Sequence, residues 1–200
     1  MVVKNDLFDY ENRIIFQDTN SFKFSVDSIL LAEYVDLNKK NLNILDMCTG
    51  NAVIPLILSK YTNNNIIGFE IQTEIYKLGK KSIDENNLNT ITLINDDIKN
   101  IGNYYKKENF DIITCNPPYF KLGEDKVISE KEALKIARHE LKIKLEDIFI
   151  IAKSYLKNKG ALYIVHRADR IDEIIINANK YNINVKNITF VTTKKGCNPY

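Results

Sequence analysis

Three features of the 200-residue chain predict an α/β protein, in which a mostly parallel, twisted sheet carries helices on both faces. Short runs of β-branched residues predict strands, and segments with helical periodicity separate these runs. Alternation of strand and helix favours parallel pairing. The apolar content of 44% suffices for one sizeable core, and no linker or repeat divides the chain. We therefore predict a single domain, with a helical lead-in over residues 1–40 and the core over 41–200.

Six segments are predicted to be strands because each is short, apolar and rich in β-branched residues. They span residues 43–47, 65–70, 90–95, 110–115, 161–165 and 185–193. In a parallel sheet the carboxyl ends of the strands meet at one edge, where open α/β proteins bind ligands. The residues that follow the first four strands are therefore the candidates for a site.

Two helices can be placed from their patterns. A helix ahead of the first strand is expected to begin with Ser25 or Asp27 as its cap and to carry Ile29, Leu30 and Tyr34 inward. A second helix is predicted where apolar residues recur at the spacing of one helix face. These residues are Ile148, Ile151, Ala152, Tyr155 and Leu156.

Composition excludes several classes of protein. Three cysteines, Cys48, Cys115 and Cys197, are too scattered for a disulfide framework, and two histidines allow no metal-ligand spacing. We therefore expect reduced cysteines and no metal. The chain has no long apolar run and no signal peptide, so we expect a cytoplasmic protein without membrane contact.

The net charge of +2 is unevenly spread along the chain. Residues 1–50 hold five Lys and Arg against eight Asp and Glu, whereas residues 151–200 hold nine against three. A basic carboxy-terminal quarter suits contact with a polyanion, although solvated Lys-rich faces are commoner than nucleic-acid sites.

The first predicted strand runs into a loop of small residues. The strand ends near Asp46, and the loop continues through Cys48, Thr49 and Gly50 to Ala52. Small residues let the backbone approach a cofactor, and the amides at a helix start favour negative groups. With Gly50 alone, the glycine pattern of a dinucleotide-binding loop is missing. Taken by itself, the loop is equally compatible with a plain strand-to-helix turn.

Acidic residues follow the second and third strands. Glu70 ends the second strand, where a carboxylate can accept hydrogen bonds from both hydroxyls of a ribose. Asp96 and Asp97 follow the third strand, and one of them could accept a hydrogen bond from an adenine amino group. Each residue taken alone is more typical of a surface acid or a helix cap.

The most specific motif is Asn116-Pro117-Pro118-Tyr119, directly after the fourth strand. Prolines lack an N–H and fix φ, so the strand must stop there with a rigid end. The Asn116 side-chain oxygen and the Pro117 carbonyl can accept hydrogen bonds from one NH2 group, and Tyr119 can stack on the planar group that carries it. This arrangement would orient a nitrogen and stabilise its developing positive charge, which fits methyl transfer from a sulfonium. The alternative interpretation is a simple turn, but the full tetrapeptide at a strand end favours a functional role.

With the loop, the acids and the tetrapeptide in this order, the chain resembles the class I methyltransferases, which have a Rossmann-like fold, and their NPPY subset. Within that subset it looks most like the bacterial tRNA1(Val) (adenine-37 N6)-methyltransferases. The likeness covers about residues 22–195. The closer likeness is carried by Phe24, residues 27–32, 114–120, 137–140 and 165–167, and Arg170.

The resemblance implies S-adenosylmethionine as cofactor, tRNA as partner and the residue roles that follow. The implied cofactor-binding residues are Asp46, Cys48, Thr49, Gly50, Glu70, Ile71, Asp97, Ile98 and Asn116. The implied substrate-binding residues are Phe24, Asp27, Tyr119, Phe120, Lys121, Arg138 and His139. The implied catalytic residues are Asn116, Pro117 and Tyr119.

The chain departs from the family pattern in two places. Relatives have glycines at the positions of Cys48 and Ala52, so side chains here narrow the cofactor cleft and weaken binding. The chain also ends at Tyr200, where relatives continue into a final antiparallel strand. We expect the sheet to lack that strand and the protein to be less stable, because an unpaired edge remains.

Several alternatives stay open. A lone histidine such as His139 is more often a packing or capping residue than a functional one, and Lys121 and Arg138 are by default solvated charges. Other NPPY enzymes methylate a protein glutamine or a guanine of ribosomal RNA. A different class is a nucleic-acid-binding relic that has lost cofactor binding. We expect a monomer.

Overall fold

The computed structural model describes residues 1–7, 10, 13–18, 26–38, 40–118 and 143–192. The chain divides into two compact units. The first comprises Met1–Asn116 and Tyr155–Val165, and the second Pro117–Ser154 and His166–Tyr200. The single domain expected over residues 1–200 stays a prediction.

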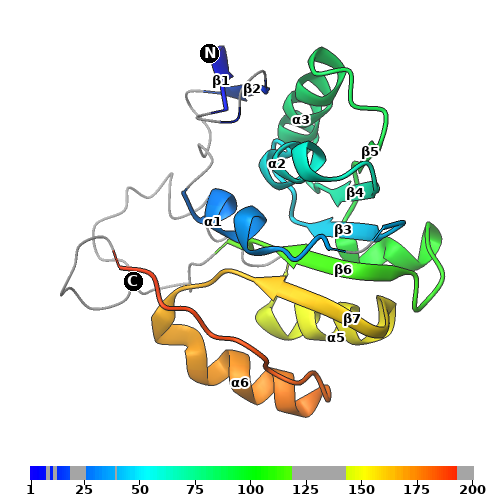
Figure 1. Cartoon of the computed structure of the whole chain (residues 1–200), viewed down its shortest axis with the longest axis vertical. Coiled ribbons are helices and arrows are strands. Elements are labelled where there is room, and N and C mark those ends of the chain that lie inside the picture. Colours follow the sequence, from blue (N-terminus) through cyan, green and yellow to red (C-terminus); the bar gives the residue numbers. More distant parts are fainter. Residues whose placement is uncertain (8–9, 11–12, 19–25, 39, 119–142, 193–200) are drawn as a thin grey trace. The chain divides into compact units, whose positions relative to one another are not determined.

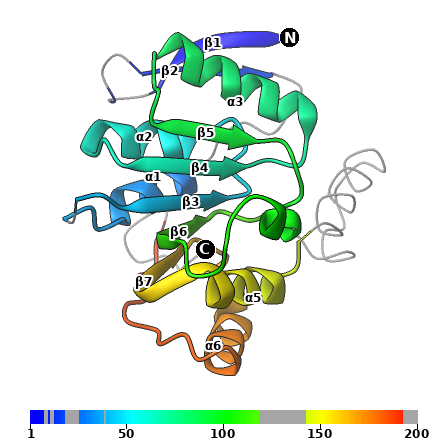
Figure 2. The ribbon, with the colours of Figure 1, turned by 90° about the vertical axis from the view of Figure 1, so that its right-hand side faces the viewer.

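The first unit is built on a five-stranded parallel sheet with the order β5-β4-β3-β6-β7 (Figure 1). The strands are β3 (Asn43–Met47), β4 (Asn65–Phe69), β5 (Ile91–Ile94), β6 (Phe110–Cys115) and β7 (Leu156–Ile164), and Figure 2 shows them in this order. The predicted α/β fold with a parallel sheet is thus confirmed. Leu156, predicted to be helical, instead begins β7. The strand order reverses between β3 and β6, and open α/β sheets bind ligands at such a switch point.

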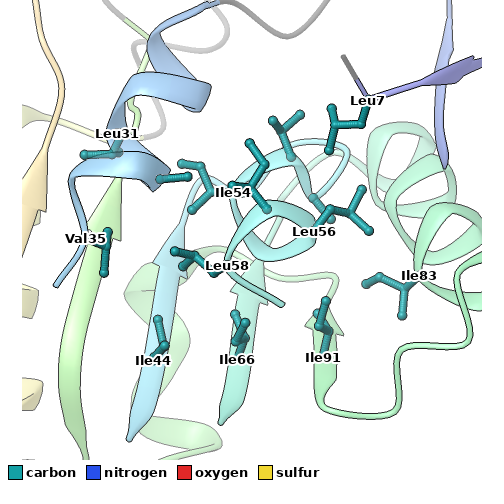
Figure 3. Close-up of a cluster of buried hydrophobic side chains, with 14 of the residues drawn as sticks. Leu7, Leu31, Val35, Ile44, Ile54, Leu56, Leu58, Ile66, Ile83 and Ile91 are labelled. Atoms are coloured by element: carbon teal, nitrogen blue, oxygen red, sulfur yellow. The ribbon is translucent and has the colours of Figure 1, made fainter. Parts of the chain in front are cut away.

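Three helices cover one face of this sheet. They are α1 (Val26–Tyr34), α2 (Val53–Tyr61) and α3 (Thr73–Glu85). Alternate strand residues face them, so Ile44, Ile66 and Ile91 enter one buried cluster with helix residues such as Leu56 and Ile83 (Figure 3). The helix expected ahead of the first strand is present as α1, but Leu30 and Tyr34, which were expected to face inward, are exposed, and Ser28, Leu31 and Ala32 are buried instead. Asp27 lies in the first turn of α1 and so is not its cap.

The opposite face of the sheet carries aromatic side chains and the 3₁₀ helix η1 (Ile98–Asn103). Phe69 of β4 meets Tyr104 edge-on with ring centroids 5.6 Å apart. Phe110 of β6 meets Tyr105 at 5.2 Å. Alternation of strand residues between the two faces accounts for Phe69, which is three residues after Ile66 of the buried cluster.

The lead-in of residues 1–40 is only partly helical, which corrects the prediction. β1 (Val2–Asp6) and β2 (Ile14–Asp18) form an antiparallel pair ahead of α1. Side chains of α3 and of its C-cap residue Asn86 complete the other edge of β2. The Phe16 N–H donates to the Ser82 hydroxyl and the Ile14 N–H to the Asn86 side-chain oxygen, each over 2.9 Å. The short apolar, β-branched runs that begin at Val2 and Ile14 could have predicted these two strands.

The second unit contains α5 (Leu145–Tyr155, with Tyr155 itself in the first unit), η2 (Ala168–Arg170) and α6 (Ile171–Lys180). Ile148, Ile151 and Ala152 are buried, which confirms the predicted helix. Glu146 of α5 accepts hydrogen bonds from Lys180 and Tyr181 at the end of α6.

The prediction of a sixth strand over residues 185–193 is wrong for residues 185–192, the part of this segment that the structure describes. These residues have no regular structure, and Val185, Ile188 and Phe190 are exposed. A strand needs a neighbouring strand for its backbone groups, and no described strand forms a ladder with this segment.

Candidate functional site

The turn after β3 is held in an unusual backbone conformation. Cys48, Gly50 and Ala52 have φ values of 57°, 59° and 69°, in the left-handed region that only glycine adopts without strain. The Thr49 N–H donates to the Phe69 carbonyl over 2.9 Å, which ties the turn to the end of β4. A Cβ added to Gly50 would meet no atom within 4 Å, so the described residues leave space there.

Glu70 joins this turn to the start of α3. Its side chain is 4% exposed, and its Oε2 accepts a hydrogen bond from the Gly50 N–H over 3.0 Å. Its Oε1 accepts one from the Gln72 N–H over 2.8 Å, and the Asn95 amide donates to the Glu70 carbonyl. The structure therefore brings together two residues that were predicted to share a site, Gly50 and Glu70.

Asp46 lies fully buried at the end of β3. Its Oδ1 accepts a hydrogen bond from the Thr114 hydroxyl of β6 over 2.7 Å. Within the described residues, Asp46 Oδ2 and the Thr49 hydroxyl are buried with no hydrogen-bond partner. Burial raises the pKa of Asp46 to about 7, the hydrogen bond from Thr114 opposes this shift, and the nearby Glu70 charge adds to it. Near neutral pH this carboxyl therefore exists in both protonation states.

Two glycines let the turn pack tightly. A Cβ on Gly68 of β4 would lie 2.9 Å from the Thr49 side chain and 2.6 Å from Leu93. A Cβ on Gly79 of α3 would lie 3.3 Å from the Gly50 carbonyl oxygen. The absence of side chains at these points brings α3 and β4 against the turn.

The two acids after β5 have structural partners. Asp97 caps η1, since its Oδ1 accepts a hydrogen bond from the Lys99 N–H over 3.0 Å. Asp96 accepts hydrogen bonds from Asn100 and Tyr104, which hold its pKa below the usual range. Helix capping was the alternative for these acids, and the adenine contact of Asp97 stays a prediction. Ile98 is buried, while Ile71 is half-buried.

Asn116 directly follows β6 and is half-buried. Its side-chain nitrogen donates a hydrogen bond to the Ser28 hydroxyl of α1 over 2.8 Å. Ser28 is 8% exposed, and its neighbour Asp27 is half-buried. Sequence reasoning assigned no role to Ser28 or Thr114. Each could have been noticed as a polar residue among apolar neighbours, Ser28 in a helix and Thr114 in a strand.

Several predicted residues lie outside the described part of the chain. They are Phe24, Tyr119, Phe120, Lys121, Arg138 and His139. Pro117 is described and is the first residue of the second unit. Among the described residues, no three His, Cys, Asp or Glu side chains are grouped to hold a metal, and no helix is long and apolar enough to cross a membrane.

A surface hollow in the described part of the chain is lined by residues of α3. They are Tyr76, Lys77, Lys80, Lys81, Asp84 and Glu85. None of these residues was predicted to bind cofactor or substrate. Two of its lysines are paired on the same helix, Lys77 with Glu74 and Lys80 with Asp84.

Comparisons with known proteins indicate the family of the chain. The family described as "Methyltransferase domain" matches residues 38–195. A tRNA1(Val) (adenine(37)-N6)-methyltransferase from Phocaeicola vulgatus is 24% identical over 195 residues, covering 98% of this chain and 81% of its own. A protein of the same name from Haemophilus influenzae is 33% identical over 135 residues, covering 66% and 56%.

Solved structures show the same fold. The crystal structure of M. jannaschii TYW2 in complex with AdoMet has a TM-score of 0.61 at 15% identity, covering 90% of this chain and 73% of that one. The crystal structure of a predicted O-methyltransferase from Agrobacterium tumefaciens has a TM-score of 0.58 at 18% identity, covering 76% and 66%. The Rossmann-like expectation for the fold is confirmed.

Proposed function

Because the chain belongs to the methyltransferase domain family and is therefore an S-adenosylmethionine-dependent methyltransferase, we propose that it methylates N6 of an adenine in tRNA. The proposed acceptor is adenine 37 of tRNA1(Val), the base in the name of the Phocaeicola vulgatus relative. The observation that carries this proposal is that likeness, which extends over 98% of the chain.

The strand ends of the first unit fit the cofactor. A Cβ added to Gly50 would meet no atom within 4 Å, so the turn has room for part of the cofactor. Asp46 and Thr49 supply buried polar atoms that have no hydrogen-bond partner among the described residues. When bound, S-adenosylmethionine supplies an electrophilic methyl group on its sulfonium. We assign the turn from Asp46 to Gly50 to the methionine part, Glu70 to the ribose hydroxyls, and Asp97 with Ile98 to the adenine.

Asn116 receives the acceptor. An adenine turned out of its stack presents its amino group, and the Asn116 oxygen accepts a hydrogen bond from it. The Pro117 carbonyl is assigned the second hydrogen bond of that amino group, and Tyr119 the stacking contact. These contacts orient the nitrogen and stabilise its positive charge as the bond forms, so no strong base is needed.

The remaining assignments concern the RNA partner. Lys121 and Arg138 are proposed to contact phosphates of the anticodon stem, which set the register of the RNA without reading its sequence. His139 and Phe120 are also assigned to binding of the RNA substrate. The proposal puts the protein in the cytoplasm, where tRNA is found, and we expect it to act as a monomer.

The test is to incubate the protein with labelled S-adenosylmethionine and unmodified total tRNA, and to identify the labelled nucleoside by mass spectrometry. We expect N6-methyladenosine, and we expect a tRNA1(Val) transcript with guanine at the target position to stay unlabelled. Asn116→Ala should abolish turnover and leave cofactor binding largely intact. Labelled protein with unlabelled RNA would instead indicate glutamine methylation.

A further inference from the structure

We propose that Ser28 is a positioning residue for methyl transfer, which holds the Asn116 carboxamide so that its oxygen faces the acceptor amino group. The proposal rests on the acceptor role of Asn116 described above. Ser28 does not itself touch the reacting atoms. It acts through the hydrogen bond that joins two residues 88 positions apart in the chain.

The geometry of a carboxamide carries this inference. The Asn116 Nδ2 donates to Ser28 Oγ over 2.8 Å, and the oxygen of the same planar group points the other way. An Asn side chain has a broad, roughly two-fold preference about its last torsion, so the free group samples both orientations. In the reversed orientation an NH2 group would face the NH2 group of the acceptor. Two donors cannot bond, so only one orientation is productive.

Both ends of the hydrogen bond stand on fixed elements. Ser28 is 8% exposed, and three and four residues on, Leu31 and Ala32 anchor α1 in the core at 5% and 2% exposed. Beyond the other end of α1, the Asp36 N–H donates to the Tyr163 hydroxyl of β7 over 3.3 Å. Asn116 follows Cys115, whose carbonyl accepts a hydrogen bond from the Val165 N–H. A site held by such elements is more exact than one on a free loop.

The expected effect of losing the bond is moderate. A neutral hydrogen bond of ordinary net strength biases two orientations by about two- to tenfold, so its loss lowers the productive fraction by no more than about twofold. Misplacement of a reacting group lowers the rate by up to about a hundredfold. We therefore expect Ser28→Ala to lower kcat for tRNA methylation about tenfold, with the cofactor Kd unchanged.

A matched control separates positioning from packing. Ser59 of α2 is buried to a similar degree, 9% exposed, and its hydroxyl donates to the Leu56 carbonyl over 2.8 Å. Ser59→Ala removes the same group from a buried helix face, so it should lower Tm by a similar amount and leave kcat unchanged. Ser28→Thr and Ser28→Val form a second pair of equal size, of which only the threonine retains the hydroxyl. We expect the threonine variant to be active and the valine variant to be slow.

The experiment measures kcat, KM for tRNA, cofactor Kd by calorimetry and Tm for wild type, Asn116→Ala and these four variants. If Ser28→Ala or Ser28→Val has the kcat of wild type, the positioning role is overturned. The proposed function still stands in that case, provided that wild type methylates tRNA and Asn116→Ala does not. An equal loss of kcat in Ser59→Ala would overturn it as well. A wild-type protein inactive on tRNA, or an active Asn116→Ala, would overturn the proposed function and this inference together.

Discussion

Asp46 and Thr114 are register partners on neighbouring parallel strands, and the Thr114 hydroxyl donates a hydrogen bond to the buried Asp46 carboxyl over 2.7 Å. The pair lies at the point where the strand order reverses. Because Asp46 is fully buried, desolvation disfavours its charged form. Its protonation therefore couples the stability of the fold to pH at the proposed cofactor site.

Stability should fall as pH rises across the titration range of Asp46. The folded-state pKa is about 7, against an ordinary value of 3.8, so the folded protein keeps a proton that the unfolded chain has already released. The free energy of unfolding of wild type, relative to Asp46→Asn, should drop by about 2 kcal/mol from about pH 5 to about pH 7. Urea unfolding without cofactor at several pH values measures this difference. A difference that is constant or rises with pH would contradict it.

Thr114→Val should destabilise the protein more at high pH than at low pH. The valine retains the shape but leaves Asp46 without its donor, and a hydrogen bond to a charged group is stronger than one to a neutral group. We expect a loss of about 1–3 kcal/mol near pH 8 and less near pH 5. Thr92→Val, at an exposed position of β5, is the control and should show no such pH dependence. Equal losses at both pH values would contradict the pairing.

Cys48→Gly should both stabilise the fold and tighten cofactor binding. Cys48 has a φ of 57°, where a side chain costs strain that glycine does not. The expected gain is about 0.5 kcal/mol, since glycine also loses more backbone entropy on folding. Lys159→Gly, at a φ of 65° in β7, should relieve the same kind of strain without changing the cofactor Kd. Tm and calorimetry with S-adenosylmethionine measure the two effects, and unchanged affinity in Cys48→Gly would contradict the second.

Gly68→Ala should disturb the turn through Thr49. The new Cβ would lie 2.6 Å from Leu93 and 2.9 Å from Thr49, so both side chains must move. Overpacking of this kind costs about 1–3 kcal/mol, and we expect weaker cofactor binding as well. Gly102→Ala, whose Cβ would meet the Tyr155 hydroxyl at 3.1 Å, is the control away from the turn. Normal cofactor affinity in a folded Gly68→Ala variant would show that the turn tolerates the shift.

Sequence alone was sufficient where local patterns decide structure. Strands β3, β4, β5 and β6 follow from short β-branched runs, and α5 from the spacing of apolar residues. The sequence predicted that α1 exists but not which of its residues are buried, since Leu30 and Tyr34 are exposed. Because parallel strands end at a common edge, the neighbourhood of Gly50 and Glu70 was also predictable. The hydrogen bond between the Gly50 N–H and Glu70 confirms that they meet.

Only the tertiary structure decided which distant side chains pair. Thr114 reaches Asp46 because β6 lies beside β3 in the sheet, and Ser28 reaches Asn116 because α1 packs near the end of β6. The antiparallel pair at the amino terminus and the absence of a strand over residues 185–192 were decided in the same way, since a strand exists only where a partner satisfies its backbone. The local spacing of apolar residues determines which segments form helices and which form strands. Long-range packing determines which polar groups meet. Burial shifts the pKa of Asp46, and the Asn116 amide donates a hydrogen bond to the Ser28 hydroxyl.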